Sequence, residues 1–280
     1  MSACPLCAGE ARAAQPGVLA CRACGLVYKE EKYFGPPAYA EGLAEDIYGR
    51  AKTGLFAAGL DWLGRRLPGK GRLLDVGCAT GELLKAAAAR GWLAEGLEPD
   101  PALARKAEAG GFSVERGKLG GAGLVPGAYS AVTVFEAFCL MEDPAAAAAG
   151  LFGLLRPGGA LYAREFNASF HLALAGPEAA GLFRPLGARP AVLHNFNFRA
   201  RTLRVLLERA GFTEVTVRNS RPTSGDPYRT GGRLGGVLTA GLKVLYYWLA
   251  QALWLGTLGR VHAGSALIVT ARKPGAAPTR

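Results

Sequence analysis

The stretch LLDVGCATGELL, Leu73–Leu84, joins a short apolar run to a turn of small residues and then to the beginning of a helix. Small residues let the backbone approach a ligand closely, and the first turn of a helix offers unpaired N–H groups. A dinucleotide fold requires the spacing G-x-G-x-x-G, but here Gly77 and Gly81 stand on either side of Ala79. Asp75, at the head of the turn, would repel a pyrophosphate. The stretch therefore predicts a turn that binds a ligand carrying positive charge.

Strand and helix patterns alternate from residue 72 onward. Short apolar runs predict strands at Arg72–Val76, Leu93–Glu98, Phe112–Glu115, Tyr129–Phe135, Ala160–Glu165, Phe212–Val217 and Ala266–Ala271. Helical patterns, some with apolar residues at spacings of three and four, predict helices at 43–66, Gly81–Arg90, Pro101–Ala109, Pro144–Leu155 and Ala200–Ala210. This alternation predicts an α/β fold whose mostly parallel sheet is covered by helices on both faces. In such sheets ligands bind beyond the carboxyl ends of the strands, where the turn after Val76 would lie.

The composition is sufficient for a large hydrophobic core, but it does not indicate which kind of partner the protein binds. Half of the 280 residues are apolar, and 33 Lys and Arg against 22 Asp and Glu give a formal charge of +11. A basic surface suits nucleic acid, an anionic membrane or a phosphorylated substrate. The N-terminus has no apolar secretion signal, and six cysteines are too few for a disulfide scaffold. We therefore expect a cytoplasmic protein.

Four of the six cysteines form two C-x-x-C pairs near the N-terminus. Thirteen residues separate Cys4 and Cys7 from Cys21 and Cys24, a spacing that can place four thiolates around one tetrahedral Zn²⁺. A redox pair is the alternative, but such pairs more usually lie near a βαβ unit. Four protein ligands leave no open coordination position, so the predicted zinc is structural. The chain is therefore divided into a zinc ribbon at 1–30, a linker at 31–42 and a larger domain at 43–280.

Two segments interrupt the alternating pattern of the larger domain, at 166–198 and 219–260. Within the second, residues 235–258 are apolar on nearly every side, with Lys243 and Gln251 as interruptions. The stretches without a charge are too short to predict a membrane span. A buried helix, a lid over the substrate, a homodimer interface and a helix lying on a membrane all fit this pattern. We favour burial or packing between copies on the sequence alone.

Five motifs in chain order resemble those of the class I S-adenosylmethionine-dependent methyltransferases. They are DVGCATG at 75–81, GLEPD at 96–100, YSAVTVFEAF followed by MEDP, LLRPGGALY, and HNFNFRARTLRVLLERAGF. The first motif departs from the family pattern at Ala79, which replaces the middle glycine. The resemblance covers about residues 43–271. It implies a Rossmann-like, seven-stranded methyltransferase sheet with S-adenosylmethionine as the cofactor.

The resemblance also implies which residues hold this cofactor. Its methionine part would be held by the turn, at Asp75, Gly77, Cys78, Ala79 and Gly81. Glu98 would accept hydrogen bonds from both ribose hydroxyls, since a carboxylate offers acceptors for both. The other implied contacts are Leu97 and Pro99 beside the adenine, Lys118 and Leu119 at its edge, and Phe135 and Glu136 facing the sulfonium. We expect Cys78 to fill space in the turn and not to act as a nucleophile.

The sequence is less specific about the methyl acceptor. Relatives often carry a Glu-His pair after the fourth strand, where this chain has Cys139 and Leu140. The candidates for catalysis are therefore His194, Glu136 and Glu165, with a structural role favoured for His194. A zinc ribbon before such a domain resembles bacterial small-molecule and sugar methyltransferases, which implies an acceptor such as a sugar, a glycan-lipid or another biosynthetic intermediate. Two alternatives stay open: a methyltransferase acting on ribosomal or transfer RNA, and a catalytically silent cofactor-binding scaffold.

Overall fold

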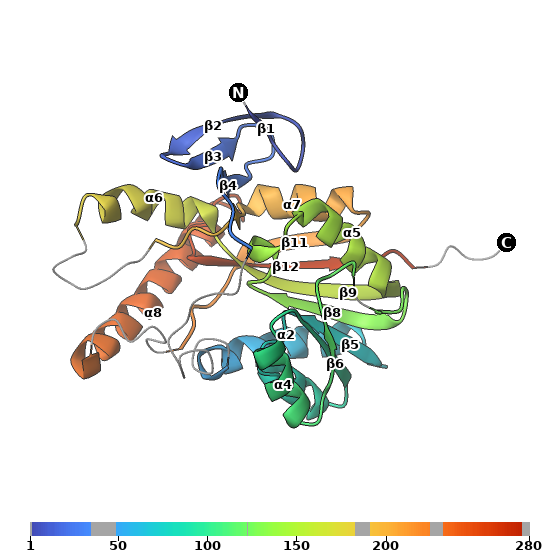
Figure 1. The fold of residues 1–280 in the computed structure, drawn as a ribbon. Coiled ribbons are helices and arrows are strands. Elements are labelled where there is room, and N and C mark those ends of the chain that lie inside the picture. Colours follow the sequence, from blue (N-terminus) through green and yellow to red (C-terminus); the bar gives the residue numbers. More distant parts are fainter. Residues whose placement is uncertain (1, 35–48, 122, 183–190, 225–231, 276–280) are drawn as a thin grey trace.

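The computed structural model describes residues 2–34, 49–121, 123–182, 191–224 and 232–275. Its centre is a seven-stranded sheet with the order β11-β12-β9-β8-β5-β6-β7 (Figure 1). The strands are β5 (Arg72–Val76), β6 (Leu93–Glu98), β7 (Ser113–Arg116), β8 (Tyr129–Phe135), β9 (Leu155–Phe166), β11 (Thr213–Asn219) and β12 (Ala266–Arg272). Strands β5 to β9 pair in parallel, whereas β12 runs antiparallel to both of its neighbours. This mixed α/β sheet confirms the predicted fold class.

The predicted strands agree closely with the structure except at the beginning of β9. The sequence pattern places Leu155 at the end of a helix, whereas Leu155 pairs with Tyr129 of β8. The next residues include Gly158 at a φ of +75°, and the pairing with β8 changes register between Tyr129 and Ala131. A search for apolar runs misses the beginning of β9, because Leu155 is followed by an arginine, a proline and two glycines.

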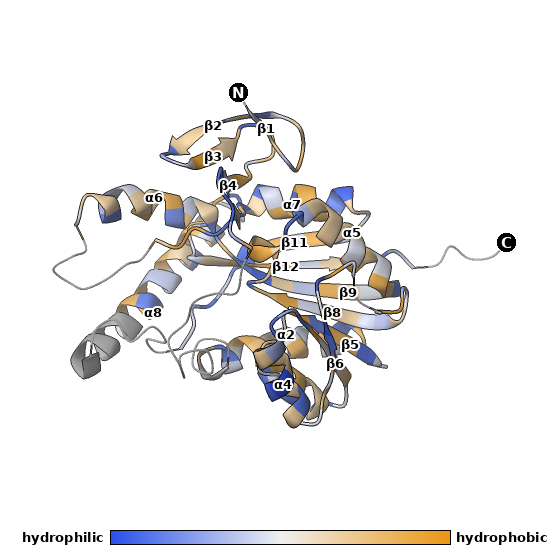
Figure 2. Ribbon diagram, in the orientation of Figure 1, coloured by the Kyte–Doolittle hydropathy of each residue, from blue (hydrophilic) through white to orange (hydrophobic). Residues whose placement is uncertain are grey.

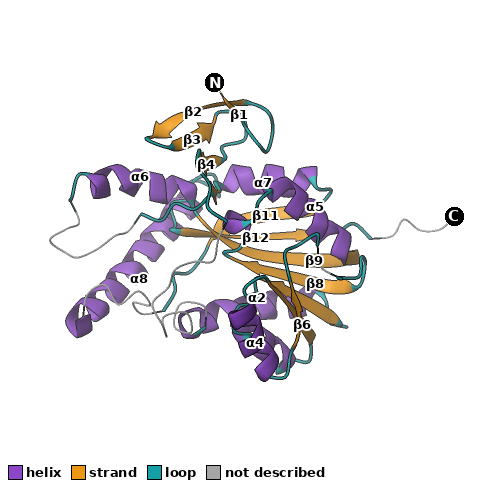
Figure 3. Ribbon diagram, in the orientation of Figure 1, coloured by secondary structure: helices purple, strands orange, loops and turns teal. Residues whose placement is uncertain are grey.

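Helices cover both faces of the sheet (Figure 3). One face carries α2 (Thr53–Arg66), α3 (Glu82–Ala88) and α4 (Pro101–Ala109), and the other carries α5 (Pro144–Leu154) and α7 (Ala200–Arg209). Asp100 and Asp143 cap α4 and α5 by accepting backbone hydrogen bonds, and each precedes a proline at the first helical position. These local signals explain why both helix starts are predicted correctly. Residues 43–48 of the predicted first helix lie outside the described part; the 3₁₀ turn η1 (Arg50–Lys52) precedes α2.

A second sheet of five strands joins the N-terminal residues to the first insertion. Its order is β1-β2-β3-β4-β10, with β1 (Ser2–Ala3), β2 (Glu10–Gln15), β3 (Val18–Cys21), β4 (Val27–Lys29) and β10 (Phe196–Asn197). The strand β10 comes from the predicted insertion at 166–198 and pairs with β4. On α7, the Thr202 hydroxyl donates to the Cys24 carbonyl at 3.0 Å, and Arg209 donates to the Leu6 carbonyl at 2.8 Å. The N-terminal sheet is therefore fastened to the larger domain by backbone pairing and by side chains of α7.

The two insertions also supply α6 (Ala168–Ala179) and α8 (Gly232–Gly256), which project from the same side of the central sheet (Figure 1). Of the two arrangements favoured from the sequence, burial within one chain does not hold for the described part of α8, whereas packing between copies stays a prediction. Between residues 241 and 256, Ala250 is the one residue classed as buried, while Leu245, Trp248 and Leu249 are each about 60% exposed. Among the described residues, no helix is long and apolar enough to cross a membrane.

Candidate active site

The turn at 77–81 connects the carboxyl end of β5 to the first turn of α3. Three of its residues have positive φ angles: Gly77 at +78°, Ala79 at +47° and Gly81 at +84°. The Gly77 N–H donates to the Leu97 carbonyl of β6 at 2.8 Å, which fixes the turn against the neighbouring strand. A Cβ added at Gly81 would lie 3.0 Å from the Cβ of Ala107. Glycine at this position therefore satisfies both a left-handed backbone and a close approach of α4.

Two buried carboxyl groups flank this turn. Asp75 in β5 accepts a hydrogen bond from the Thr133 hydroxyl of β8 at 2.6 Å. Glu98, the last residue of β6, accepts hydrogen bonds from the N–H groups of Ala79 and Asp100, both at 2.9 Å. Burial raises the pKa of Asp75 to about 7, and burial also raises the pKa of Glu98. Both carboxylates would be stabilised by a positive charge or by hydroxyl donors brought to them.

The remaining residues of the predicted cofactor set near the turn are Leu97, Pro99 and Cys78. Leu97 is buried below the turn and Pro99 is exposed beside it. Cys78 is buried, and a Cβ added at Gly96 of β6 would lie only 2.4 Å from its Sγ. The thiol therefore occupies space that a glycine on β6 leaves open, and burial raises its pKa. Both observations favour a packing role for Cys78.

The other predicted contacts lie at the ends of β7 and β8. Lys118 is exposed and forms an ion pair with Glu142, and Leu119 is partly buried against the core. The Phe135 ring lies against Phe56, with 5.0 Å between the ring centroids, and it stacks on Tyr162. Phe135 therefore joins the core between α2 and the sheet.

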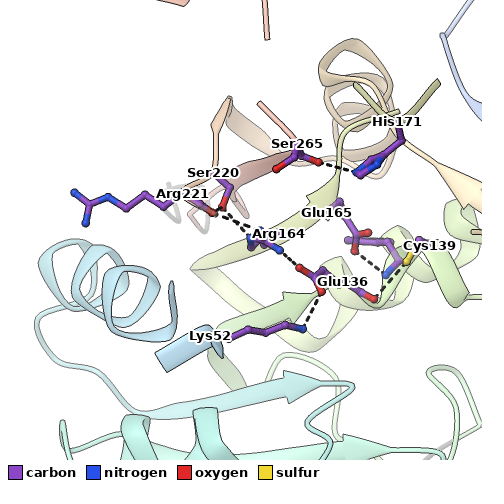
Figure 4. Close-up of polar contacts among 10 residues, drawn as sticks. Lys52, Glu136, Cys139, Arg164, Glu165, His171, Ser220, Arg221 and Ser265 are labelled. Atoms are coloured by element: carbon purple, nitrogen blue, oxygen red, sulfur yellow. Dashed lines mark hydrogen bonds and ion pairs between the residues drawn. The ribbon is translucent and has the colours of Figure 1, made fainter. Parts of the chain in front are cut away.

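A buried ion-pair network follows the carboxyl ends of β8 and β9 (Figure 4). Glu136 has a φ of +59°, which is unusual for a residue other than glycine. Its carboxylate lies 2.8 Å from Lys52 Nζ and also contacts the Arg164 guanidinium. Arg164 Nε donates to the Ser220 hydroxyl at 2.8 Å. Burial and the nearby charge of Arg164 lower the pKa of Lys52 to about 7. Two cations thus hold one carboxylate in place.

This network lies beside the turn. A Cβ added at Gly77 would lie 3.1 Å from the Cβ of Ala137, the residue after Glu136. The acidic group that follows β8 and the small residues that follow β5 are therefore neighbours at the same edge of the sheet, as expected for parallel strands.

Glu165 and His194, the other predicted catalytic residues, are both inside the protein. Glu165 Oε1 accepts a hydrogen bond from the Phe138 N–H at 2.9 Å, while Oε2 has no hydrogen-bond partner among the described residues. Burial raises the pKa of Glu165 to about 7. The His194 ring lies 5.1 Å from the Phe166 ring, and burial lowers its pKa to about 4. His194 is therefore neutral at physiological pH, whereas Glu165 titrates near it.

Sequence patterns do not single out Lys52, Arg164 or Ser220 as residues of this site. An arginine inside the apolar strand pattern LYAREF is a signal for Arg164, since a charged group in a buried strand requires a partner. Lys52 precedes a helix and Ser220 follows a strand, where such residues are common on surfaces. Their positions become informative only in the folded chain, which brings Lys52 to Glu136 and Ser220 to Arg164.

The N-terminal cysteines gather into one thiol cluster. The four Sγ atoms lie within 4.8 Å of one another and belong to Cys4, Cys7, Cys21 and Cys24. Cys4 Sγ and Cys24 Sγ are 3.6 Å apart, and Cys7 Sγ and Cys21 Sγ are 3.5 Å apart. Thiolates about 2.3 Å from a tetrahedral zinc ion are separated by about 3.8 Å. The donor set and its spacing therefore fit a four-coordinate zinc ion.

A family model described as a methyltransferase domain matches residues 48–217, more than half of the chain. The chain belongs to this methyltransferase family. The matched range contains the turn, both of its flanking carboxyl groups and Glu136 with its two cations. The thiol cluster and α8 lie outside the range.

Individual relatives agree with this membership. A ubiquinone biosynthesis O-methyltransferase of Xylella fastidiosa is 32% identical over 139 residues, which are 46% of this chain and 56% of that protein. The match therefore spans little more than half the length of this curated relative.

Solved structures share the fold at low identity. A Mesorhizobium loti S-adenosylmethionine-dependent methyltransferase has a TM-score of 0.52 at 19% identity, covering 80% of this chain and 98% of its own. A geranyl diphosphate C-methyltransferase of Streptomyces coelicolor has a TM-score of 0.51 at 17% identity, covering 86% of each chain. At these identities the likeness concerns the fold alone.

Proposed function

We propose that the chain transfers the methyl group of S-adenosylmethionine to a small-molecule acceptor. The observation that carries this proposal is the pair of buried carboxyl groups, Asp75 and Glu98, on either side of a turn of small residues. They stand on adjacent parallel strands, at the edge of the sheet where α/β proteins bind ligands. Membership of a methyltransferase family supports the same function.

The residues of the turn fit the proposed cofactor. A buried carboxyl group with a raised pKa gains stability from a cation, so Asp75 suits the ammonium of the methionine part. Glu98 uses each oxygen for one backbone hydrogen bond and keeps acceptor capacity for ribose hydroxyls. When bound, the cofactor supplies an electrophilic methyl group on a sulfonium. The task of this chain's residues is to align the acceptor and exclude water.

Within this proposal the two acceptor-side carboxyl groups have different roles. Glu136 lies between Lys52 and Arg164, so we assign it the role of a carboxylate that is held in place and positions the acceptor. Glu165 has a pKa of about 7 and can take up a proton from a hydroxyl near neutral pH. We assign this proton to Glu165 and not to His194, whose pKa of about 4 makes it a weak base.

A small hydroxylated molecule is the acceptor class that we propose. The relative named as a ubiquinone biosynthesis O-methyltransferase supports a small-molecule acceptor and O-methylation. Sugars, glycan-lipids and other biosynthetic intermediates fall within this class.

We also propose that the thiol cluster holds a structural Zn²⁺, because its four thiols leave no position open for a substrate.

Calorimetry with S-adenosylhomocysteine tests the cofactor site. The Asp75→Ala variant should bind at least about ten-fold more weakly, since it loses a charge-assisted contact. Asp61→Ala, which removes an exposed carboxylate on α2, is the matched control and should bind as the wild type does. An unchanged Kd for Asp75→Ala would refute the placement of the cofactor.

Methyl transfer from labelled S-adenosylmethionine tests the acceptor class. Extracts of small molecules and bulk RNA are offered separately, and we expect label in the small-molecule fraction. Label in RNA would contradict a small-molecule acceptor and favour RNA as the acceptor. Absence of label in both fractions would favour a catalytically silent scaffold.

Once an acceptor is known, the pH dependence of the methylation rate tests the base. Glu165→Gln should lose the change of rate near pH 7, whereas His194→Ala should show the same pH dependence as the wild type.

A further inference from the structure

The exposed face of α8 consists of apolar residues. Between residues 241 and 256 every exposed position lacks a polar side chain: Gly241, Leu242, Val244, Leu245, Trp248, Leu249, Ala252, Leu253, Leu255 and Gly256. We call these ten residues the α8 face. A helix on the surface of a soluble domain normally turns its polar side to water, and contiguous exposed apolar surface of this kind marks an interaction site. Hydrophobic residues recur along the described part of α8 (Figure 2).

Contacts of Ala250, Gln251 and Tyr246 hold one side of α8 against β11 and α6. Gln251 Nε2 donates to the Tyr247 hydroxyl at 2.8 Å. From β11, Asn219 donates to the Ala250 carbonyl at 3.1 Å and to Gln251 Oε1 at 3.3 Å. The Tyr246 ring lies 5.0 Å from the Phe170 ring of α6. The α8 face is therefore held outward by specific contacts on the opposite side of the helix.

The charge around α8 distinguishes between possible partners. Asp226 is the last acidic residue of the sequence, so residues 227–280 contain only basic charges, among them Lys243 within α8 and Arg260 just after it. A second copy of the chain would bring the same basic segment to this face and would add like charges to a protein of net charge +11. An anionic lipid surface complements both the apolar side chains and the positive charge.

We propose that α8 is a membrane-docking helix that lies on an anionic lipid bilayer, with the α8 face among the headgroups and upper acyl chains. Trp248, which is exposed, has an amphipathic ring that favours this depth. The described residues of the helix do not form a membrane span, so the docking is peripheral. This inference does not depend on methyl transfer. It would bring the acceptor side of the site toward the bilayer, because Ser220, which contacts Arg164, adjoins Asn219.

Co-sedimentation of the full chain with lipid vesicles tests the proposal. We expect the protein to sediment with phosphatidylglycerol-containing vesicles at low salt, less at high salt, and little with pure phosphatidylcholine. Leu245→Glu combined with Leu249→Glu should lower the bound fraction about ten-fold or more, since two charges would enter the apolar region. Leu93→Glu is the matched control: Leu93 is 66% exposed at the beginning of β6, away from the helix, and its variant should bind as the wild type does.

Independent readouts protect the test from a folding artefact. All variants are first compared by circular dichroism, and the single variant Trp248→Gln serves if the double variant melts early. Brominated lipid should quench the tryptophan fluorescence of the wild type, and the quenching should fall in Trp248→Gln. The proposal is overturned if the wild type stays in solution with anionic vesicles at low salt. It is also overturned if the folded double variant, Leu245→Glu with Leu249→Glu, still sediments with the vesicles. A third contradicting outcome is a wild type that is dimeric in solution and a double variant that is monomeric.

Discussion

The cofactor side and the acceptor side of the proposed site are built in different ways. The cofactor side uses one continuous stretch, from Asp75 through the turn and α3 to Glu98, and its main contacts are backbone N–H groups and two carboxylates. The acceptor side gathers Lys52, Glu136, Arg164 and Ser220 from four distant parts of the chain. The first is set by local geometry, whereas the second depends on the packing of the whole domain.

The N-terminal sheet and α8 extend this contrast. Strand β4 of the N-terminal sheet pairs with β10, and Asn219 holds α8. Strands β1 to β4 and α8 lie outside the part matched by the family model, whereas β10 lies inside it. The cofactor side therefore lies wholly within the matched range, whereas the acceptor side combines Lys52, Glu136 and Arg164 of that range with Ser220, which lies outside it. Changes on the acceptor side should alter stability and acceptor choice more than cofactor affinity.

Removal of the proposed zinc should have the largest effect. The N-terminal sheet has short strands, and we propose that its four clustered cysteines hold a zinc ion, so loss of that metal should unfold the sheet and lower Tm. Metal analysis and thermal melting before and after a chelator measure this. Cys4→Ser should reproduce the loss, and Cys139→Ser, outside the cluster, should keep the metal. A metal content well below stoichiometric in carefully purified protein, with an unchanged Tm, would contradict the prediction.

Loss of the carboxylate at the centre of the ion-pair network should have the second-largest effect on stability. Glu136→Gln leaves Lys52 and Arg164 buried together without their shared anion and should cost about 3–5 kcal/mol of unfolding free energy. Lys52→Met should cost less, because the pair of Glu136 and Arg164 survives. Urea denaturation of both variants checks the order. Equal destabilisation would show that the network does not behave as a shared carboxylate.

The pH dependence of stability should report on Asp75. Its folded-state pKa is raised to about 7, so the folded protein holds a proton that the unfolded chain has already lost. Stability of the cofactor-free protein should therefore fall as the pH rises from about 4 through about 7, by roughly 2–4 kcal/mol. Asp75→Asn should remove the part of this dependence that comes from Asp75, while Glu165, whose pKa is also raised to about 7, keeps its own part. Saturating S-adenosylhomocysteine should stabilise the wild type at high pH. A wild type and an Asp75→Asn variant with parallel pH profiles would exclude Asp75 as the source.

The smallest effect is expected for the cysteine of the turn. Cys78→Ala should cost about 1 kcal/mol, the loss of a small buried group, and should leave the affinity for S-adenosylhomocysteine unchanged. Gly96→Ala should be worse, because its Cβ would be placed 2.4 Å from Cys78 Sγ. Calorimetry and denaturation together separate the two effects. A large loss of affinity in Cys78→Ala would give the thiol a role beyond packing.

Different parts of this molecule could be predicted to different degrees from the sequence. The starts of α4 and α5 were accessible because aspartate followed by proline is a local signal for a helix start. The beginning of β9 was not, since Leu155 joins the sheet through pairing with a strand that lies far from it in sequence. The apolar pattern of α8 predicted a helix correctly but not its exposure, because hydropathy does not say which side of a helix the fold will cover.

The sequence by itself determined the α/β class, the turn that follows β5 and the cluster of four cysteines. Each of these depends on residues close together in the chain or on a fixed spacing. The tertiary structure alone decided that Lys52 and Arg164 share the carboxylate of Glu136, that Glu165 is buried with a raised pKa, and that α8 turns its apolar side outward. Burial and ion pairing depend on distant segments that meet only in the folded chain. LLDVGCATGELL thus predicts where a cofactor would sit, and the packing around it decides what could meet the methyl group.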